Sequence, residues 1–253
     1  MTTNDERQAA ARTALACLDL TSLNAADAPA DIERLCRRAQ GRFGTVAAVC
    51  VWPRFAALAR SLLPPSIAVA AVANFPDGGS DIQRALRDTG EIVDAGAQEV
   101  DLVLPYRDLD AAPALVAAVR RASAGLRLKV ILETGALQHE APIGRACRIA
   151  LDAGADFLKT STGKTPVSAT PAAATLLLTA IAQHETASSR AGFKAAGGIR
   201  TVADAALYIA LVAEILGADA LQPSRFRLGA SGLLDDIEAV LSGGQRLAGR
   251  SAY

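Results

Sequence analysis

The sequence predicts a single (β/α)8 barrel, a closed ring of parallel strands surrounded by helices, and three observations support this. Apolar strand-like runs alternate with helix-like stretches along the chain. From residue 46 onward the runs recur about every 21 to 35 residues, which is the length of one strand–helix unit. Counted with a run near Cys17, they number eight. Such alternation indicates a parallel sheet covered by helices, and eight strands favour closure into a barrel.

The first elements follow from local composition. Residues 3–16 are polar and then alanine-rich, which predicts a short N-terminal helix. Residues 16–21 form a short apolar run broken by an acid, which predicts the first strand. Residues 31–41 are amphipathic with helical spacing, and residues 46–52 form a continuous apolar strand that Pro53 ends.

The same alternation continues to the end of the chain. A helix is predicted over residues 55–63, a strand over residues 67–75, and a helix over residues 81–97 with Ser80 as its N-cap. Further strands are expected to begin near residues 99, 127, 156, 191 and 221. Further helices are expected over residues 114–124, 139–153, 171–184, 202–216 and 233–241.

Length and composition predict one domain that spans residues 1–253. The chain has 253 residues, a usual length for one barrel, and its hydrophobic content of 51% allows a large core. No linker or shift in composition divides it. The formal net charge is +0 with no block of like charge, so the pattern argues against nucleic acid or a membrane as a partner.

The N-terminal residues and the cysteines predict a cytoplasmic protein. Residues 1–7 are polar without an apolar signal core behind them, and no apolar run is long enough to span a bilayer. The cysteines form no C-x-x-C pair, so we expect free thiols in a reducing compartment. They are Cys17, Cys36, Cys50 and Cys147.

Lysine is scarce in this chain. Of the 26 basic side chains only four are lysines, and all four fall in or just after strand-like segments: Lys129, Lys159, Lys164 and Lys194. Because lysine can lose its proton and attack a carbonyl, whereas arginine cannot, these positions are candidates for amine chemistry. Chance survival of ordinary surface lysines is the alternative interpretation.

Lys159 is the strongest of these candidates. It lies in residues 156–164, a predicted buried strand that leads into a polar turn. Burial disfavours the charged form of a lysine and lowers its pKa. We therefore expect a neutral amine at this position, and a neutral amine is a nucleophile toward carbonyls.

Charged residues recur with one parity along the predicted strands. Alternate residues of a barrel strand point inward, and active sites lie at the C-terminal strand ends. If this parity faces inward, six side chains converge: Asp19, Asp101, Lys129, Glu133, Lys159 and Lys194. Charges of both signs in a low-dielectric cavity shift one another's pKa values. An inert buried salt-bridge network is the alternative, although such networks seldom repay their desolvation.

Two glycine-rich loops predict a phosphate site. Residues 195–199 follow the seventh strand, and residues 227–232 follow the eighth. Loops at these two places commonly hold a phosphate in barrels, through glycine N–H groups and a helix N-terminus. Either loop alone is compatible with an ordinary glycine turn, but the two together favour phosphate binding.

Other catalytic patterns fit the sequence poorly. Residues 163–165 resemble the end of a P-loop, but Leu158 stands where that motif needs its first glycine. His139 and His184 fall in or at the start of predicted helices, which argues against a histidine triad or a zinc site, and no metal is expected. Cys50, in an apolar strand, is more typical of a core thiol than of a nucleophile.

Six segments, in this order and spacing, carry a resemblance to a known family. They are residues 49–55, 99–101, 128–135, 157–164, 193–201 and 226–231. The chain resembles the deoxyribose-phosphate aldolases, class I (Schiff-base) aldolases with a (β/α)8 barrel, over nearly its whole length. The resemblance implies reversible cleavage of 2-deoxy-D-ribose 5-phosphate to D-glyceraldehyde 3-phosphate and acetaldehyde, in deoxyribonucleotide catabolism. It implies no metal or organic cofactor.

The resemblance also implies roles for individual residues. Lys159 is the implied Schiff-base lysine, Lys194 is the neighbouring charge that keeps it neutral, and Asp101 is the carboxylate that relays protons. The phosphosugar and the aldehyde are the expected partners, with a homodimer as the candidate assembly. The residues implied to bind substrate are Asp19, Thr21, Cys50, Lys129, Thr162, Lys164, Gly197, Gly198, Gly229, Ser231 and Gly232.

Three positions bear on how closely the chain follows the family. Asp77 stands where members often carry histidine, and Gly232 stands where many have a second serine. The glycine either weakens phosphate binding or leaves the backbone N–H to provide it. Tyr253 ends a tail that we expect to be flexible from Gly243 onward. The resemblance implies instead that Tyr253 folds over the pocket as a proton-transfer group.

Two other functions compete with this interpretation. A transaldolase-like transferase would also use a Schiff-base lysine in a barrel, but it needs a longer phosphosugar acceptor and fits the sequence less well. A non-catalytic phosphosugar-binding barrel is the alternative from another class. The joint presence of Lys159, Lys194 and Asp101 argues against it.

Overall fold

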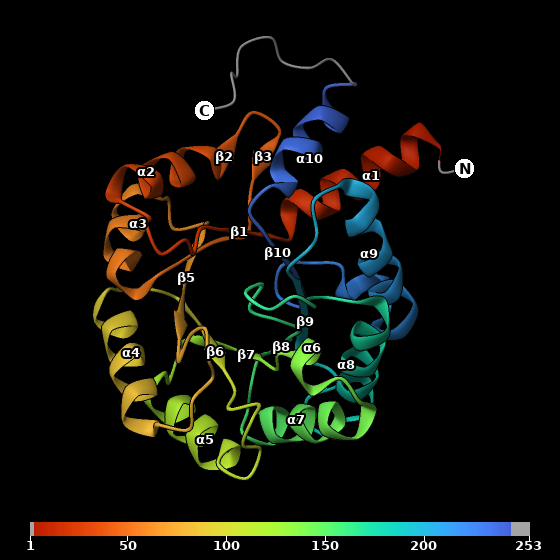
Figure 1. The fold of residues 1–253 in the computed structure, drawn as a ribbon. Coiled ribbons are helices and arrows are strands. Elements are labelled where there is room, and N and C mark those ends of the chain that lie inside the picture. Colours follow the sequence, from red (N-terminus) through yellow and green to blue (C-terminus); the bar gives the residue numbers. More distant parts are fainter. Residues whose placement is uncertain (1–2, 244–253) are drawn as a thin grey trace.

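A computed structural model describes residues 3–243, and within them eight parallel strands close into a barrel (Figure 1). Neighbouring strands follow chain order around the ring, and the last strand pairs with the first. The predicted (β/α)8 barrel is therefore confirmed. The barrel strands are β1 (Leu18–Thr21), β4 (Ala48–Val51), β5 (Ala68–Ala73), β6 (Glu99–Val103), β7 (Arg127–Ile131), β8 (Phe157–Lys159), β9 (Gly192–Ala196) and β10 (Phe226–Ala230).

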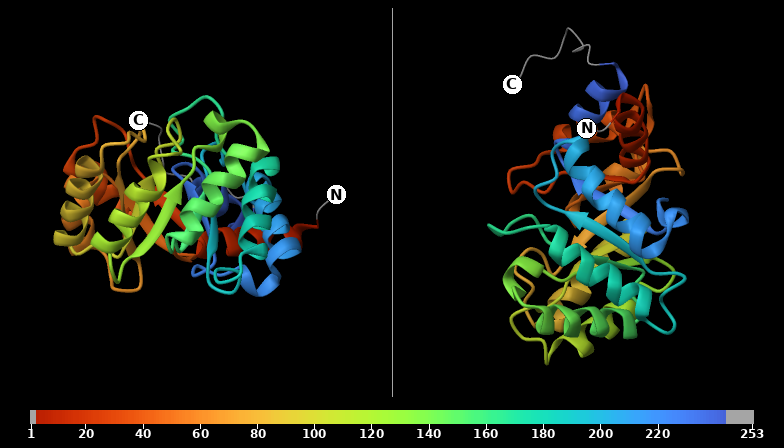
Figure 2. Two further views of the ribbon diagram at one scale, coloured as in Figure 1. Left: turned by 90° about the horizontal axis from the view of Figure 1, so that it is seen from below. Right: turned by 90° about the vertical axis from the view of Figure 1, so that its right-hand side faces the viewer.

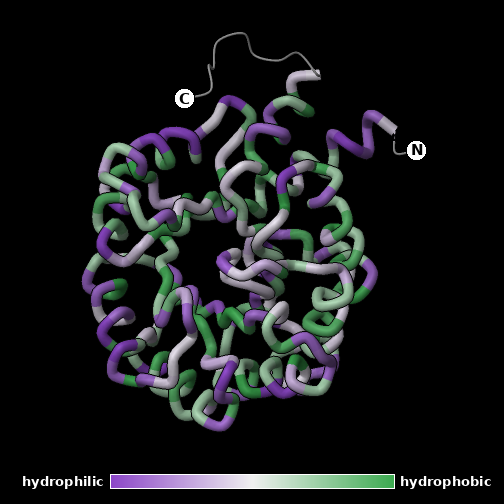
Figure 3. The backbone as a smooth tube through the Cα atoms, viewed as in Figure 1, coloured by the Kyte–Doolittle hydropathy of each residue, from purple (hydrophilic) through white to green (hydrophobic). Residues whose placement is uncertain are grey.

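Helices form a ring outside the strands (Figure 1), and the views from below and from the side show helices on the outside of the barrel (Figure 2). Hydrophilic residues recur along the outer rim of this ring (Figure 3). The predicted N-terminal helix is present, and α1 packs against α9 and α10. The helices are α1 (Asn4–Ala16), α2 (Pro29–Arg38), α3 (Ala56–Leu62), α4 (Ile82–Asp94), α5 (Ala112–Ala122), α6 (Thr134–Leu137), α7 (Glu140–Asp152), α8 (Pro171–Gln183), α9 (Val202–Leu216) and α10 (Leu233–Leu241).

Short elements that were not predicted join some of these units. They are the antiparallel pair β2 (Gln40–Gly41) and β3 (Gly44–Thr45), and the 3-10 turns η1 (Pro53–Phe55) and η2 (Ala218–Ala220). Among residues 3–243, no helix is both long and apolar enough to cross a bilayer. The predicted flexible tail, with Tyr253, falls on residues 244–253 and lies outside the described residues.

The predicted N-cap of α4 is wrong. Asp81, not Ser80, precedes the helix, and its carboxylate accepts hydrogen bonds from the backbone N–H groups of Gln83 and Arg84. A carboxylate at this position satisfies two free N–H groups and also interacts favourably with the helix dipole.

The predicted start of the last strand is also wrong. We expected a strand from about residue 221, but β10 begins at Phe226. Leu221 closes the η2 turn, its N–H donating to the carbonyl of Ala218. Pro223 has no N–H to give to a strand ladder, which explains why the apolar run near Leu221 does not extend into the sheet.

Strand register places charged residues side by side within the barrel. Asp101 of β6 is the register partner of Lys129 of β7, and Lys159 of β8 is the partner of Lys194 of β9. Because side chains alternate along a strand, register partners share one face of the sheet. These four side chains are buried and hydrogen-bond to one another inside the ring.

Candidate active site

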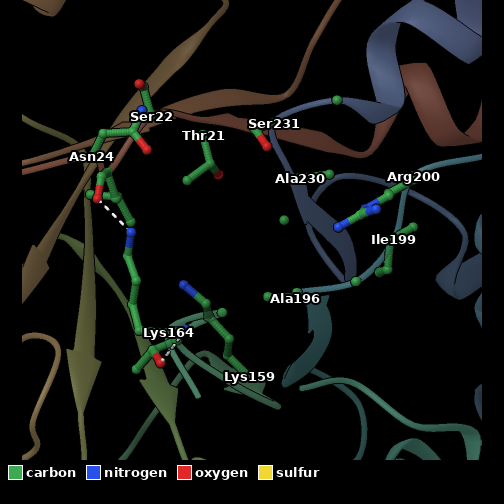
Figure 4. Close-up of a pocket in the computed structure, with 17 residues that line it drawn as sticks. Thr21, Ser22, Asn24, Lys159, Lys164, Ala196, Ile199, Arg200, Ala230 and Ser231 are labelled. Atoms are coloured by element: carbon green, nitrogen blue, oxygen red, sulfur yellow. Dashed lines mark hydrogen bonds between the residues drawn. The ribbon is translucent and has the colours of Figure 1, made fainter. Parts of the chain in front are cut away.

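A cavity of about 490 Å³ opens beyond the C-terminal ends of β1, β8, β9 and β10 (Figure 4). This is the end of the strands at which barrel enzymes carry their active sites. Lys159 lies in its wall together with eight of the residues predicted to bind substrate. Those eight are Thr21, Thr162, Lys164, Gly197, Gly198, Gly229, Ser231 and Gly232.

Lys159 ends β8 and is 3% exposed, with its side chain directed into the cavity (Figure 4). Its Nζ lies 2.7 Å from Oδ2 of Asp101. Burial lowers the pKa of the Lys159 amine, and the charge of Lys194 lowers it further, against an opposing effect of Asp101. The arrangement therefore favours a neutral, nucleophilic amine in contact with the cavity.

Lys194 is the charged member of the lysine pair. Its Nζ lies 2.8 Å from Oδ2 of Asp101 and 2.5 Å from Oδ2 of Asp19. Burial works against the Lys194 charge, but these two carboxylates raise its pKa above the usual value. A single carboxylate oxygen of Asp101 thus contacts both lysine amines, so a proton can move between them over hydrogen-bond distances.

Asp101 is held ionised at the centre of this group. It is completely buried, and burial by itself favours protonation. The three lysines around it nevertheless hold the pKa of its carboxyl well below the usual value. Its Oδ1 accepts from Lys129 at 2.7 Å, which leaves Oδ2 for Lys159 and Lys194.

Glu99 and Arg227 extend the cluster below the lysines, and sequence reasoning missed both. Arg227 donates to Oδ1 of Asp19 at 2.5 Å and to Oε1 of Glu99 at 2.7 Å. Lys129 lies 2.5 Å from Oε2 of Glu99. The signal was available, because Glu99 has the same strand parity as Asp101 and is equally buried.

The charges of this cluster balance when Lys159 is neutral. Three buried carboxylates face three buried cations, and Arg127 at the solvent edge also pairs with Glu99. A proton on Lys159 would add a positive charge to a group that is already compensated. One amine of the cluster, that of Lys159, faces the cavity without a carboxylate of its own.

Glu133 lies outside this cluster, contrary to the prediction that it converges with the lysines. Its carboxylate turns to the loop after β8, where it accepts hydrogen bonds from Thr162 and Thr165. The prediction extended the alternation of side chains beyond Ile131, where β7 ends. The chain changes direction before Glu133, so the alternation no longer applies there.

The turn after β9 brings backbone N–H groups to the cavity. Gly197 and Gly198 both have left-handed conformations, with φ of 88° and 83°. A Cβ on Gly197 would also meet Ser168 at 2.6 Å. Gly197 therefore needs to be glycine for both conformation and space, and Gly198 for conformation. Such turns present N–H groups that bind anions.

The end of β10 and the two residues after it complete this wall. Residues 227–230, which we expected in a loop after the eighth strand, belong to β10 itself. Ser231 and Gly232 line the cavity, and Gly232 directly precedes α10, whose N-terminus favours anions. Gly229 leaves room for the neighbouring lysine, because a Cβ there would approach Cε of Lys194 to 3.0 Å. A phosphate group fits the chemistry of this wall.

Several cavity residues were missed by sequence reasoning. Ser22 and Asn24 follow β1, and Arg200 follows the glycine turn, with its side chain in the close-up view (Figure 4). Arg200 belongs to the segment 193–201 that carried the family resemblance, so a signal existed for it. The loop after β1 has no pattern that points to a ligand.

Lys164 and Thr162 reach the cavity from the loop after β8. Nζ of Lys164 donates to the carbonyl of Leu23 at 2.7 Å, which bridges the loops after β8 and β1 (Figure 4). The backbone N–H of Lys164 donates to the hydroxyl of Thr162 at 3.0 Å.

Asp19, Cys50 and Lys129 lie beneath the cavity wall and are completely buried. Sγ of Cys50 is 3.8 Å from Oδ2 of Asp101, and burial raises the pKa of this thiol to about 11. All four cysteines of the chain are free thiols. Within residues 3–243, no group of three or more histidine, cysteine or acidic side chains could hold a metal ion. Tyr253 lies outside the described residues.

Fold and site define a barrel enzyme in which a lysine amine of lowered pKa faces a cavity, and the wall of this cavity contains a left-handed glycine turn and a helix N-terminus. A family model described as DeoC/LacD family aldolase matches residues 13–235. The chain belongs to this aldolase family. The deoxyribose-phosphate aldolase of Agrobacterium fabrum (strain C58 / ATCC 33970) is 47% identical over 255 residues, covering 98% of this chain and 97% of that protein.

Solved structures share the fold. One from Toxoplasma gondii ME49 has a TM-score of 0.85 and 24% identity, covering 97% of each chain. The deoxyribose phosphate aldolase of Aeropyrum pernix, described as a tetramer, has a TM-score of 0.73 and 24% identity, covering 94% of this chain and 98% of that one.

Proposed function

We propose that the chain is a class I aldolase that reversibly cleaves 2-deoxy-D-ribose 5-phosphate to D-glyceraldehyde 3-phosphate and acetaldehyde. The observation that carries this proposal is the position of Lys159, a buried amine of lowered pKa that faces the cavity and shares the carboxylate of Asp101 with Lys194. The relative from Agrobacterium fabrum, similar over nearly the whole chain, supports the choice of substrate.

The first step forms a Schiff base on Lys159. Its amine attacks the C1 aldehyde of the open-chain sugar and gives a carbinolamine, which loses water to become a protonated imine. The oxygen needs a proton before it leaves as water. Lys194 supplies it as an ammonium, and Asp101, which contacts both amines, accepts and returns protons between them.

The second step breaks the bond between C2 and C3. The C3 hydroxyl loses its proton, its oxygen becomes the aldehyde of D-glyceraldehyde 3-phosphate, and the bonding electrons move into the imine to form an enamine. Protonation of C2 and hydrolysis of the imine then release acetaldehyde and restore Lys159. The protonated imine is the electron sink, so the residues present need to supply only proton transfer and charge stabilisation.

The phosphate is placed at the opposite wall of the cavity. The Gly197–Gly198 turn, Ser231 and the N-terminus of α10 offer N–H and O–H donors, and Lys164 offers a positive charge. Gly232 lines the same wall, and in this proposal its backbone N–H takes the place of a serine hydroxyl.

Borohydride reduction in the presence of acetaldehyde tests the proposal. Reduction traps the imine as a stable ethyl amine, which mass analysis of peptides locates. We expect the adduct on Lys159, and its absence in a Lys159→Met variant that still folds. An adduct on Lys194 would reverse the assigned roles. No adduct with intact phosphate binding would favour a non-catalytic binding barrel.

Assembly and location follow from the same proposal. The phosphosugar and the aldehyde are the small-molecule partners, and we propose a homodimer, to be measured by light scattering. The tetramer described for the Aeropyrum pernix protein is the other outcome to be distinguished. We also propose a single domain and a cytoplasmic location, with which four free thiols are compatible.

A further inference from the structure

Glu133 has an unusual conformation and position for an acidic residue. It follows β7, is completely buried, and has left-handed backbone angles of φ 54° and ψ 56°. Non-glycine residues rarely adopt this region, and when they do the surrounding structure enforces it, often near a functional site. The mechanism proposed above assigns Glu133 no step.

The carboxylate of Glu133 is stabilised by hydrogen bonds rather than by a cation. Oε2 accepts from the hydroxyl of Thr162 at 2.5 Å and from its backbone N–H at 3.3 Å. Oε1 accepts from the hydroxyl of Thr165 at 3.1 Å, and that hydroxyl is also 3.0 Å from the carbonyl of Val167. Among residues 3–243, no ion pair involves Glu133. Among the described residues, the hydrogen-bond partners of this carboxylate therefore lie in the loop after β8.

These bonds continue across the mouth of the cavity. The hydroxyl of Thr162 accepts from the backbone N–H of Lys164, and Nζ of Lys164 donates to the carbonyl of Leu23. Glu133 is thus the buried end of a chain of hydrogen bonds from β7, through the loop after β8, to the loop after β1. Lys164 is the cationic residue of this chain of hydrogen bonds, and it lines the cavity.

Close packing reinforces this connection. A Cβ on Gly135, the second residue of α6, would meet the carbonyl oxygen of Val167 at 2.1 Å. On its other side the loop touches the glycine turn, where a Cβ on Gly197 would meet Ser168. The loop is held between α6 and the turn that carries the phosphate-binding N–H groups.

We propose that Glu133 is a positioning residue that fixes the loop of residues 162–165 so that Lys164 faces the phosphate of the substrate. The inference rests on the proposed function and deepens it. The hydroxyl proton of Thr162 is directed to Glu133, so this hydroxyl offers the substrate an acceptor and no donor. Thr162 therefore acts on the substrate through the loop, and Glu133 sets phosphate recognition without touching the phosphate.

The Glu133→Gln variant tests the role. Its amide keeps the shape of the side chain but presents N–H donors to at least one hydroxyl and loses the charge. We expect KM for 2-deoxy-D-ribose 5-phosphate to rise by about tenfold, as for one lost hydrogen bond to a charged group, with kcat nearly unchanged. Turnover of unphosphorylated 2-deoxy-D-ribose should change less than about twofold, because it lacks the group that Lys164 recognises.

Two further variants control for general damage. Glu140→Gln makes the same chemical change at an exposed position on α7 and should leave both substrates unaffected. If Glu133→Gln does not fold, Thr165→Val removes one partner of the carboxylate and should shift KM in the same direction. In a double-mutant cycle with Lys164→Met, the two increases in KM should not be additive, because both substitutions remove the same interaction.

The outcomes separate the inference from the proposed function. A wild-type protein that fails to cleave 2-deoxy-D-ribose 5-phosphate would refute the function. With an active wild type, equal losses on the phosphorylated and unphosphorylated sugars would reveal a merely structural role and overturn the inference. Unchanged KM, or additive losses with Lys164→Met, would overturn it as well.

Discussion

At the residue scale, the pair Lys159 and Lys194 shows how neighbours shift the pKa values of two identical amines in opposite directions. Both are buried and both contact Oδ2 of Asp101. Lys194 also has Asp19, whereas Lys159 has only the shared carboxylate among its ion-pair partners in residues 3–243. Burial disfavours the charge on both amines. Two carboxylates outweigh burial at Lys194 and raise its pKa, whereas the pKa of Lys159 remains lowered.

The pH dependence of activity should report this arrangement. Lys159 is active when neutral, so kcat/KM should rise with pH through the lowered pKa of its amine. In Lys194→Met the neighbouring charge is lost while Asp101 stays, so the pKa of Lys159 rises. We expect the acid limb to move to higher pH, alongside a lower maximum rate.

Lys164→Met is the matched control for that profile. The amine of Lys164 donates to the carbonyl of Leu23 and not to Asp101, the carboxylate that Lys159 contacts. We therefore expect KM to change while the acid limb of the pH profile stays in place. A limb that is unmoved in Lys194→Met would contradict the charge argument.

At the element scale, the turn after β9 couples conformation to recognition. Gly197 and Gly198 are both left-handed, but their surroundings differ. A Cβ on Gly197 would meet Ser168 at 2.6 Å, whereas a Cβ on Gly198 has no neighbour within 4 Å among the described residues. The two positions therefore separate backbone strain from steric overlap.

Alanine at each position should resolve the two contributions. We expect Gly198→Ala to lower the free energy of unfolding by about 1–2 kcal/mol, the cost of a left-handed L-residue. Gly197→Ala should cost more and raise KM for the phosphosugar further, because the turn must move away from the loop after β8. Urea unfolding and initial rates measure both effects, and equal costs would show that the overlap relaxes freely.

Much of this element-level picture could be predicted from the sequence, and the failures have physical causes. Apolar runs and their spacing located the barrel strands because buried parallel strands are apolar throughout. Parity failed at Glu133, since alternation holds only within a strand and β7 ends at Ile131. The strand expected near residue 221 failed because apolar composition cannot distinguish a packed turn from a strand.

The site residues that could be predicted are those that are unusual in their sequence context. A lysine in an apolar strand of an arginine-rich chain stands out, and so do paired glycines after a strand. Arg227 lies in the segment 226–231 that carried the resemblance, but it is one of 22 arginines and its neighbours in the sequence do not mark it as buried. Its role depends on carboxylates from β1 and β6, which only the closed barrel brings to it.

At the scale of the whole molecule, the buried ion cluster ties distant strands together. Removing one partner of a buried pair leaves an uncompensated charge, which typically costs about 3–5 kcal/mol. Arg227→Met should therefore lower the free energy of unfolding by about 3 kcal/mol at pH 7. This value is at the low end of that range because Asp19 and Glu99 keep their lysine partners. Urea unfolding provides the measurement.

Arg34→Met is the control for that loss. Arg34 pairs with Asp31 on the surface with its side chain 63% exposed, so the change should cost less than about 1 kcal/mol. Similar losses for the two arginines would mean that the cluster contributes no more than an exposed pair.

The closing seam between β1 and β10 has a consequence for the growing chain. Asp19 and Arg227, which pair across this seam, are separated by 208 residues, and Lys194 also reaches Asp19. While the last strand is still being synthesised, the barrel is open and its lysines are ordinary hydrated ammoniums. The buried environment that lowers the pKa of Lys159 is completed when β10 takes its place. We therefore expect an amine with this lowered pKa only in the finished barrel, and not in nascent or truncated chains.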